Sequence, residues 1–101
     1  MPHFFLKLVA PRPTFSADMS EAEKKMMQEH VLYWKGRQDR GEVIVFGPVM
    51  DPAGPYGMGV IEAADDAGAR AFIAGDPAMR ANCGFKCEIY PMRAVTRETV
   101  N

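Results

Sequence analysis

A single long helix is predicted for residues 20–41, which read SEAEKKMMQEHVLYWKGRQDRG. Ser20 and Glu23 have the S-x-x-E spacing of a capping box, in which each side chain accepts a hydrogen bond from the other residue's backbone N–H. Gly41 is the glycine that commonly follows a last helical turn. We therefore expect the helix to run from Ser20 to Arg40.

One face of this helix carries apolar side chains at helical spacing, with a histidine in their middle. The apolar members are Met26, Met27, Val31 and Trp34, and the histidine is His30. An imidazole on a core-facing stripe needs a hydrogen-bond partner, because burial without one is unfavourable. Two interpretations stay open: a core histidine bonded to a backbone carbonyl, or a proton-transfer residue that lines a pocket.

The segments on either side of this helix predict the rest of the fold. Strands are expected at His3–Val9, Glu42–Phe46, Met58–Ala63 and Cys83–Arg93, with Gly47-Pro48 closing the second and Met50–Gly57 forming a hairpin loop. A second helix begins at Asp65 or Asp66 and stops at Gly75, and Asp76-Pro77 opens a short turn or helix. The order βαββαβ predicts an α+β fold, a ferredoxin-like sandwich with two helices on one face of a four-stranded antiparallel sheet.

The other face of the sheet is also expected to be apolar. The first strand places Phe4, Leu6 and Leu8 on one side and Phe5 and Val9 on the other. Two helices cover only one face, and a large exposed apolar face is rare in a monomer. We therefore predict a homodimer that packs sheet to sheet. A monomer with a solvated, moderately apolar face is the alternative.

The two cysteines do not indicate a disulfide or a metal site. Cys83 and Cys87 lie in one predicted strand, and four strand residues span about 13 Å, beyond disulfide reach. They alternate with Phe85 and Ile89 along one apolar stripe, so both are expected to be reduced and at least partly buried. The absence of a CxxC pair, an HExxH motif or a histidine cluster predicts no metal. Gly57-Met58-Gly59 does not open a helix, so it is not a nucleotide-binding fingerprint.

Length and composition exclude several classes of protein. The 101 residues provide for one domain, 1–101, and 48% hydrophobic residues argue against disorder. A formal net charge of −1 without a basic cluster argues against nucleic-acid binding. No apolar stretch approaches the roughly 20 residues of a membrane span, and the N-terminal apolar run is too short for a signal peptide. The predicted location is the cytoplasm.

Asp76 is the carboxylate best placed to serve as the partner of His30. It precedes Pro77, so its evident structural role is a helix N-cap, which uses one carboxylate oxygen. The other oxygen is then free to accept a hydrogen bond from an imidazole N–H and fix the tautomer of the ring. Spacing along the chain alone does not establish that the two side chains meet.

Several short motifs in order resemble the YCII-related (YciI-like) family of the dimeric α+β barrel superfamily. They are the segments His30-Val31-Leu32-Tyr33-Trp34, Gly41-Glu42-Val43, Phe46-Gly47-Pro48 and Asp76-Pro77, followed by an apolar last strand. The resemblance spans nearly the whole chain and implies a dimeric α+β barrel with His30 and Asp76 as an active-site dyad. Many members carry an arginine one turn before the histidine, where this chain has Met26 and Met27. Arg12 or Arg37 would then replace it, or the ligand would be neutral.

The resemblance also implies a class of chemistry. A His–Asp pair without metal or cofactor suits general acid/base chemistry, an isomerisation or elimination, on a small, cyclic organic substrate. Trp34, Phe5 and Phe46 are expected to line the substrate pocket, with Arg12 as a further substrate-binding residue. The alternative is a non-catalytic dimeric module that binds a small ligand or another protein. In that case His30 and Asp76 form a purely structural pair.

Overall fold

Four strands form one antiparallel sheet in the order β2-β3-β1-β4 in the computed structural model, which describes residues 1–98. The strands are β1 (His3–Val9), β2 (Val43–Val49), β3 (Tyr56–Glu62) and β4 (Lys86–Met92). Phe5 marks the register, because it lies opposite Val60 of β3 and Tyr90 of β4. The antiparallel ferredoxin-like sheet predicted from the order of elements is therefore confirmed.

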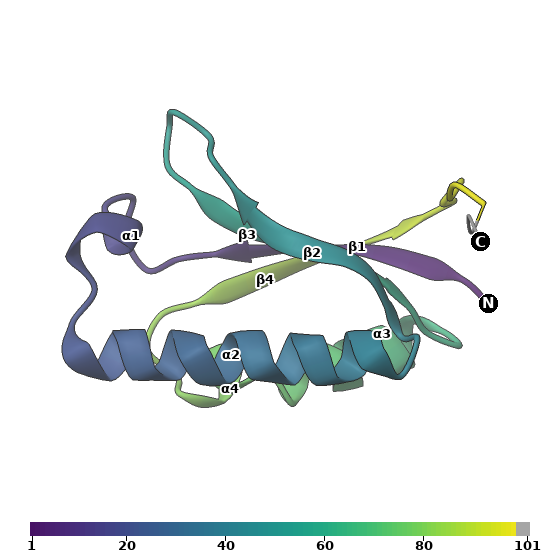
Figure 1. Ribbon diagram of the computed structural model, residues 1–101, viewed down its shortest axis with the longest axis horizontal. Coiled ribbons are helices and arrows are strands. Elements are labelled where there is room, and N and C mark those ends of the chain that lie inside the picture. Colours follow the sequence, from purple (N-terminus) through teal and green to yellow (C-terminus); the bar gives the residue numbers. More distant parts are fainter. Residues whose placement is uncertain (99–101) are drawn as a thin grey trace.

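The helices are α1 (Phe15–Asp18), α2 (Glu21–Asp39), α3 (Asp66–Ala74) and α4 (Pro77–Arg80). The last three lie together on one side of the sheet, as predicted, with α4 beside α2 (Figure 1). Ser20 and Glu23 form the expected capping box, and Gly41 adopts a φ of 82° just after the helix, the conformation that favours glycine there. None of the helices in residues 1–98 is long and apolar enough to cross a membrane.

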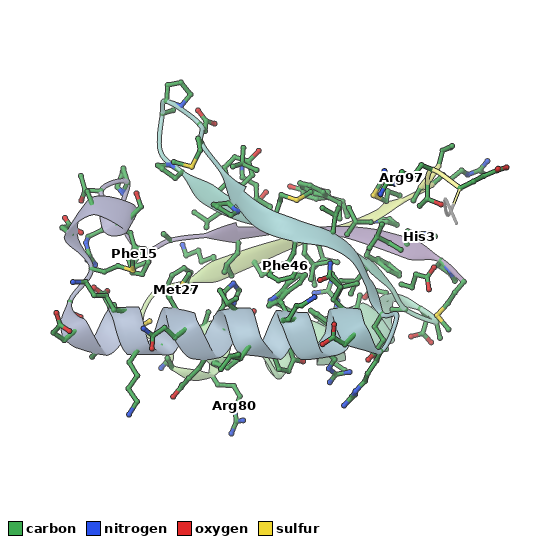
Figure 2. All side chains as sticks on the ribbon, in the orientation of Figure 1. His3, Phe15, Met27, Phe46, Arg80 and Arg97 are labelled. Carbon is green, nitrogen blue, oxygen red and sulfur yellow. The ribbon has the colours of Figure 1, made fainter. Side chains whose placement is uncertain are left out.

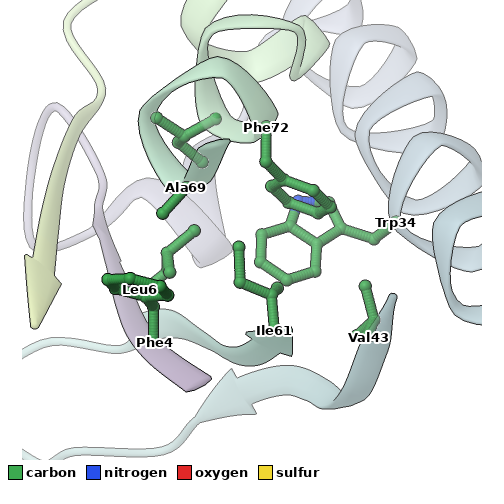
Figure 3. Close-up of a cluster of buried hydrophobic side chains, with 8 residues drawn as sticks. Phe4, Leu6, Trp34, Val43, Ile61, Ala69 and Phe72 are labelled. Atoms are coloured by element: carbon green, nitrogen blue, oxygen red, sulfur yellow. The ribbon is translucent and has the colours of Figure 1, made fainter. Parts of the chain in front are cut away.

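The main core lies between α2, α3 and the helix-facing side of the sheet. Trp34 of α2 and Phe72 of α3 meet edge to face with their ring centroids 4.7 Å apart, and both rest over Ile61 and Leu6 (Figure 3). Ile61 is 0% exposed and Leu6 is 1% exposed. Burial of these large apolar surfaces is the main force that holds α2 and α3 against the sheet.

Two strands differ from the expected bounds. Gly47-Pro48 does not close β2, which continues to Val49, because β2 is an edge strand and proline is tolerated where no neighbour needs its missing N–H. Strand β4 begins at Lys86 instead of Cys83, because Asn82 and Gly84 have φ values of 51° and 104°, which form a turn. The short helix α1 was not predicted, and no side chain caps it.

The apolar stripes are also corrected in part. Met26, His30 and Trp34 are buried, but Val31 is 48% exposed at the edge of the stripe. Cys83 is exposed because it lies in the turn before β4, so its predicted burial is wrong, whereas Cys87 is half-buried on the helix-facing side. Both cysteines are free thiols, as predicted.

Candidate active site

His30 and Asp76 form a buried pair that joins α2 to the start of α4. The imidazole Nδ1 lies 2.8 Å from each carboxylate oxygen of Asp76. His30 is 9% exposed and Asp76 is 0% exposed. The contact predicted from the spare oxygen of an N-capping aspartate is therefore confirmed.

The local sequence holds the Asp76 carboxylate in place. Asp76 caps α4, with Pro77 in the first turn, and its Oδ1 accepts a hydrogen bond from the Ala78 N–H at 2.9 Å. Its Oδ2 accepts one from the Trp34 Nε1–H at 2.6 Å. A carboxylate that accepts from two fixed N–H donors and an imidazole is satisfied in its ionised form, which only accepts.

This arrangement sets the tautomer of His30. Because the ionised carboxylate only accepts, the proton shared with it belongs on Nδ1. The other ring nitrogen, Nε2, has no hydrogen-bond partner within residues 1–98, and the side chain is on the wall of a cavity. A neutral His30 therefore presents a lone pair on Nε2 to whatever occupies that cavity.

Trp34 fixes the pair from the core side and depends on a glycine to do so. Its indole lies across β3 at Gly59, where an added Cβ would be 2.2 Å from Cζ3 and 2.5 Å from Cη2 of the ring. Only glycine leaves room for the indole there. The close approach of β3 thus sets the ring position from which Nε1–H reaches Asp76.

A cavity of about 300 Å³ opens between α2, the sheet and the segment around α1. His30, Trp34 and Phe46 all line it, together with apolar side chains such as Leu8, Met27 and Phe85. In Figure 2 Met27 and Phe46 lie in the layer between α2 and the sheet, and Phe15 projects from α1. This volume is at the lower end for small-molecule sites, so it suits a ligand of one or two rings.

Two of the predicted substrate-binding residues are not at this cavity. Phe5 lies on the opposite face of the sheet, where its ring packs 6.2 Å from that of Tyr90. Arg12 forms two hydrogen bonds of 2.8 and 2.9 Å with Glu23 and a third of 2.8 Å with Asp18. The expected places of Phe5 and Arg12 in the pocket are therefore wrong. Arg12 instead ties the segment that carries α1 to the start of α2.

Several residues of the cavity wall were not predicted from the sequence. Phe15, Ser16 and Met19 come from the unpredicted α1 segment, and Tyr56 follows the loop between β2 and β3. Nothing in their own sequence pattern indicates this role, because irregular segments have no periodicity from which a face can be read. Cys87 also lines the cavity, and the predicted alternation along the last strand did place its side chain toward the helices.

Cys87 reports on the electrostatics of the cavity wall. Burial, followed by the negative charges of Asp76 and Glu88, raises the pKa of its thiol to about 12. The thiol therefore stays protonated at neutral pH. Residues 1–98 contain no group of three or more histidine, cysteine, aspartate or glutamate side chains arranged to hold a metal ion.

Comparison with known proteins finds a similar solved structure and a matching domain family. The structure resembles that of 5-chloro-2-hydroxyhydroquinone dehydrochlorinase (TftG) from Burkholderia phenoliruptrix, solved in complex with 2,5-dihydroxybenzoquinone, with a TM-score of 0.56 and 17% sequence identity. The match covers 84% of this chain and 90% of that chain, and it establishes a shared fold. No curated protein matches the sequence. The YCII-related domain family matches residues 3–93. The chain therefore belongs to the YCII-related domain family.

Proposed function

We propose that this protein is a cofactor-free enzyme that uses His30 and Asp76 for general acid/base chemistry on a small, cyclic organic substrate. The observation that carries the proposal is the His30–Asp76 pair, bonded through Nδ1 at 2.8 Å while the ring lines an apolar cavity. A metal-free imidazole oriented by a carboxylate is suited to moving protons, because its pKa in water is near neutrality.

The proposed reaction starts with proton transfer to Nε2 of His30. The substrate loses a proton from a carbon or oxygen atom, and the imidazolium that forms is stabilised by the ionised Asp76. The electron pair left on the substrate forms a new double bond. In an isomerisation, a neighbouring double bond breaks, its electron pair moves onto a different atom, and His30 returns the proton to that atom. In an elimination, the leaving group departs with the electron pair of its own bond, and His30 later gives its proton to solvent.

The structural neighbour supports this class of reaction. The protein that it resembles is a dehydrochlorinase, captured with a dihydroxybenzoquinone. Loss of hydrogen chloride from a ring is an elimination that begins with proton abstraction. Trp34 and Phe46, whose ring centroids are 5.6 Å apart, offer aromatic surfaces against which a flat ring would stack.

A second candidate function is a binding module without catalysis. It is favoured by the structural bonds of Asp76, which caps α4 and holds Trp34 in addition to contacting His30. In that case the cavity binds a small ligand, and His30 serves only to join α2 to α4. The two candidates differ in what happens at Nε2.

The test replaces His30 by asparagine, whose amide N–H takes the place of Nδ1 and keeps the bond to Asp76. The matched control is His3→Asn, because His3 is the only other histidine in the sequence. Its Nε2 lies 3.2 Å from Oε1 of Glu62, and it does not line the cavity. Chloride release from chlorinated hydroquinones and deuterium exchange into cyclic ketones and lactones would be measured. We expect H30N to lose about 10²–10⁴-fold in rate and H3N to retain it. Equal rates in H30N and the wild type would refute the role of His30, and no turnover of any compound would favour the binding module.

We further propose that the chain forms a homodimer through the sheet face opposite the helices. That face carries Phe5 and the partly exposed Val45 and Tyr90, at 47% and 49% exposure, and none of the helices in residues 1–98 covers it (Figure 1). Light scattering should give twice the 11.2 kDa of one chain. Phe5→Glu should shift the protein to monomers, whereas Leu32→Glu should not, because Leu32 of α2 is 71% exposed and lies away from the sheet face. We place this dimer in the cytoplasm, where both thiols would stay reduced.

A further inference from the structure

The cavity wall has no formal charge other than a possible one on His30. Its lining includes no lysine, arginine, aspartate or glutamate from residues 1–98. The polar residues of its lining besides His30 include Ser16, Tyr56 and Cys87, whose thiol is protonated. The Lys7 ammonium lies 4.5 Å from the Tyr56 ring centroid, but on the face of β1 that points away from the helices. A ligand carboxylate would have to give up its hydration there without a cation to replace it, which is strongly unfavourable.

The two arginines that the sequence suggested as binders of an anionic ligand are paired with carboxylates elsewhere. Arg12 is bonded to Asp18 and Glu23, as described above. Arg37 donates to Glu42 at 2.9 Å, and its guanidinium packs 5.2 Å from the Tyr33 ring centroid and 5.5 Å from that of Phe72. Neither arginine lines the cavity. One turn before His30, the cavity wall carries Met27, a half-buried thioether without charge.

The His30–Asp76 pair does not supply the missing positive charge. With His30 neutral, the pair has a net charge of −1 because Asp76 is ionised. With His30 protonated, the pair is neutral, and the imidazolium is already matched by a carboxylate 2.8 Å away. In neither state does an anion in the cavity meet an excess of positive charge.

We infer that the cavity, which the proposed function makes the substrate site, binds uncharged ring compounds and discriminates against their carboxylates. The ligand class is a neutral molecule of one or two rings with a weakly acidic C–H or O–H that can reach Nε2 of His30. Apolar contacts with Trp34 and Phe46 provide the affinity, and the single basic nitrogen orients the ligand.

Binding of matched compounds tests this directly, because Trp34 is the only tryptophan and lines the cavity. Its fluorescence would be titrated with 4-hydroxybenzamide and 4-hydroxybenzoate, and with benzamide and benzoate, at pH 7.5. Each pair has nearly the same size and differs in charge. We expect the amides to bind at least about tenfold more tightly than the carboxylates. Equal or tighter binding of the carboxylates, or no binding of either amide, would overturn the inference.

A variant that introduces a positive charge provides the second arm. Met27→Arg places a guanidinium on the wall, and Met27→Gln is a polar control without charge. We expect M27R to bind 4-hydroxybenzoate about tenfold more tightly than the wild type does, and M27Q to leave it unchanged. An equal gain in both variants would mean that polarity, rather than charge, sets the preference, and would overturn the inference. If M27R fails to fold, the wild-type pairs still decide.

These binding measurements separate the ligand class from the enzyme proposal. A protein that prefers the neutral probes but shows no turnover in the wild type refutes the acid/base enzyme and keeps the ligand class. A protein that turns over anionic ring compounds through His30 refutes the ligand class and keeps the acid/base enzyme.

Discussion

Gly59→Ala should damage the candidate active site through one added methyl group on β3. The new Cβ would lie 2.2 Å from Cζ3 and 2.5 Å from Cη2 of Trp34, closer than carbon atoms approach in proteins. The indole is 3% exposed and its ring centroid lies 4.7 Å from that of Phe72, so it can move aside only by giving up this core contact. Any displacement also stretches the 2.6 Å bond from Nε1–H to Asp76.

The expected loss of stability has two parts. Forcing an extra carbon into a packed core costs about 1–3 kcal/mol. Loss of a hydrogen bond to a buried ionised group costs about 1.5–3 kcal/mol. Gly59→Ala should therefore lower the free energy of unfolding by about 2.5–6 kcal/mol, a large share of the roughly 5–15 kcal/mol available to a domain of this kind.

The measurement is urea denaturation followed by circular dichroism, since the fluorescence of Trp34 itself will change. Gly57→Ala is the matched control on the same strand and the same face. Its Cβ would meet Leu8 Cβ at 3.5 Å, an ordinary contact, and it should change stability by less than about 1 kcal/mol. In a Trp34→Leu background, which lacks the clashing atoms, Gly59→Ala should add little further loss. Equal stabilities of G59A and G57A would refute the role assigned to this close approach.

Two further predictions concern the thiols and the Arg12 cluster. At pH 8 a maleimide should label the exposed Cys83 rapidly and Cys87 slowly, because burial and neighbouring negative charge raise the pKa of Cys87 to about 12; peptide mass mapping that found both labelled at the same rate would contradict this. Arg12→Ala should destabilise the protein at pH 7 and have a smaller effect at pH 2.5. The hydrogen bonds of Arg12 and of the Ser20 backbone lower the pKa of Glu23 from 4.5 to about 2, so its stabilising contribution is present above pH 4.5 and is lost as the pH falls toward 2. Urea denaturation of both proteins at the two pH values tests it, and an unchanged difference would be inconsistent with this pairing.

The fold was largely predictable because its signals are local. The capping box at Ser20, the glycine at position 41 and the Asp76-Pro77 step each constrain the backbone through atoms a few residues apart. The ends of β2 and β4 were less predictable, because whether a proline such as Pro48 ends a strand depends on whether that strand lies at an edge. Strand order is a property of the whole sheet.

The candidate site was predictable where a polar side chain stands at a position that the sequence pattern assigns to the apolar core. A histidine among apolar residues requires a partner and an N-capping aspartate has an unused oxygen, which made His30 and Asp76 candidates, and the resemblance to the YCII-related family favoured their pairing. Phe5 could have been excluded by the same reasoning. It alternates with Phe4 and Leu6, and a pocket beneath the helices is open to only one set. The position of Arg12 depends on the path of an irregular segment, which no periodicity describes.

Removal of Asp76 would not distinguish a catalytic pair from a structural one. Its carboxylate caps α4, holds the Trp34 indole and orients His30 through separate hydrogen bonds. A variant at this position would lose stability and ligand geometry together, and an inactive protein would follow under either interpretation. Nε2 of His30 is different, because no described residue depends on it for a hydrogen bond. A substitution that keeps the bond at Nδ1 and removes the base at Nε2 therefore changes the chemistry while sparing the network that holds α2, α4 and Trp34 together.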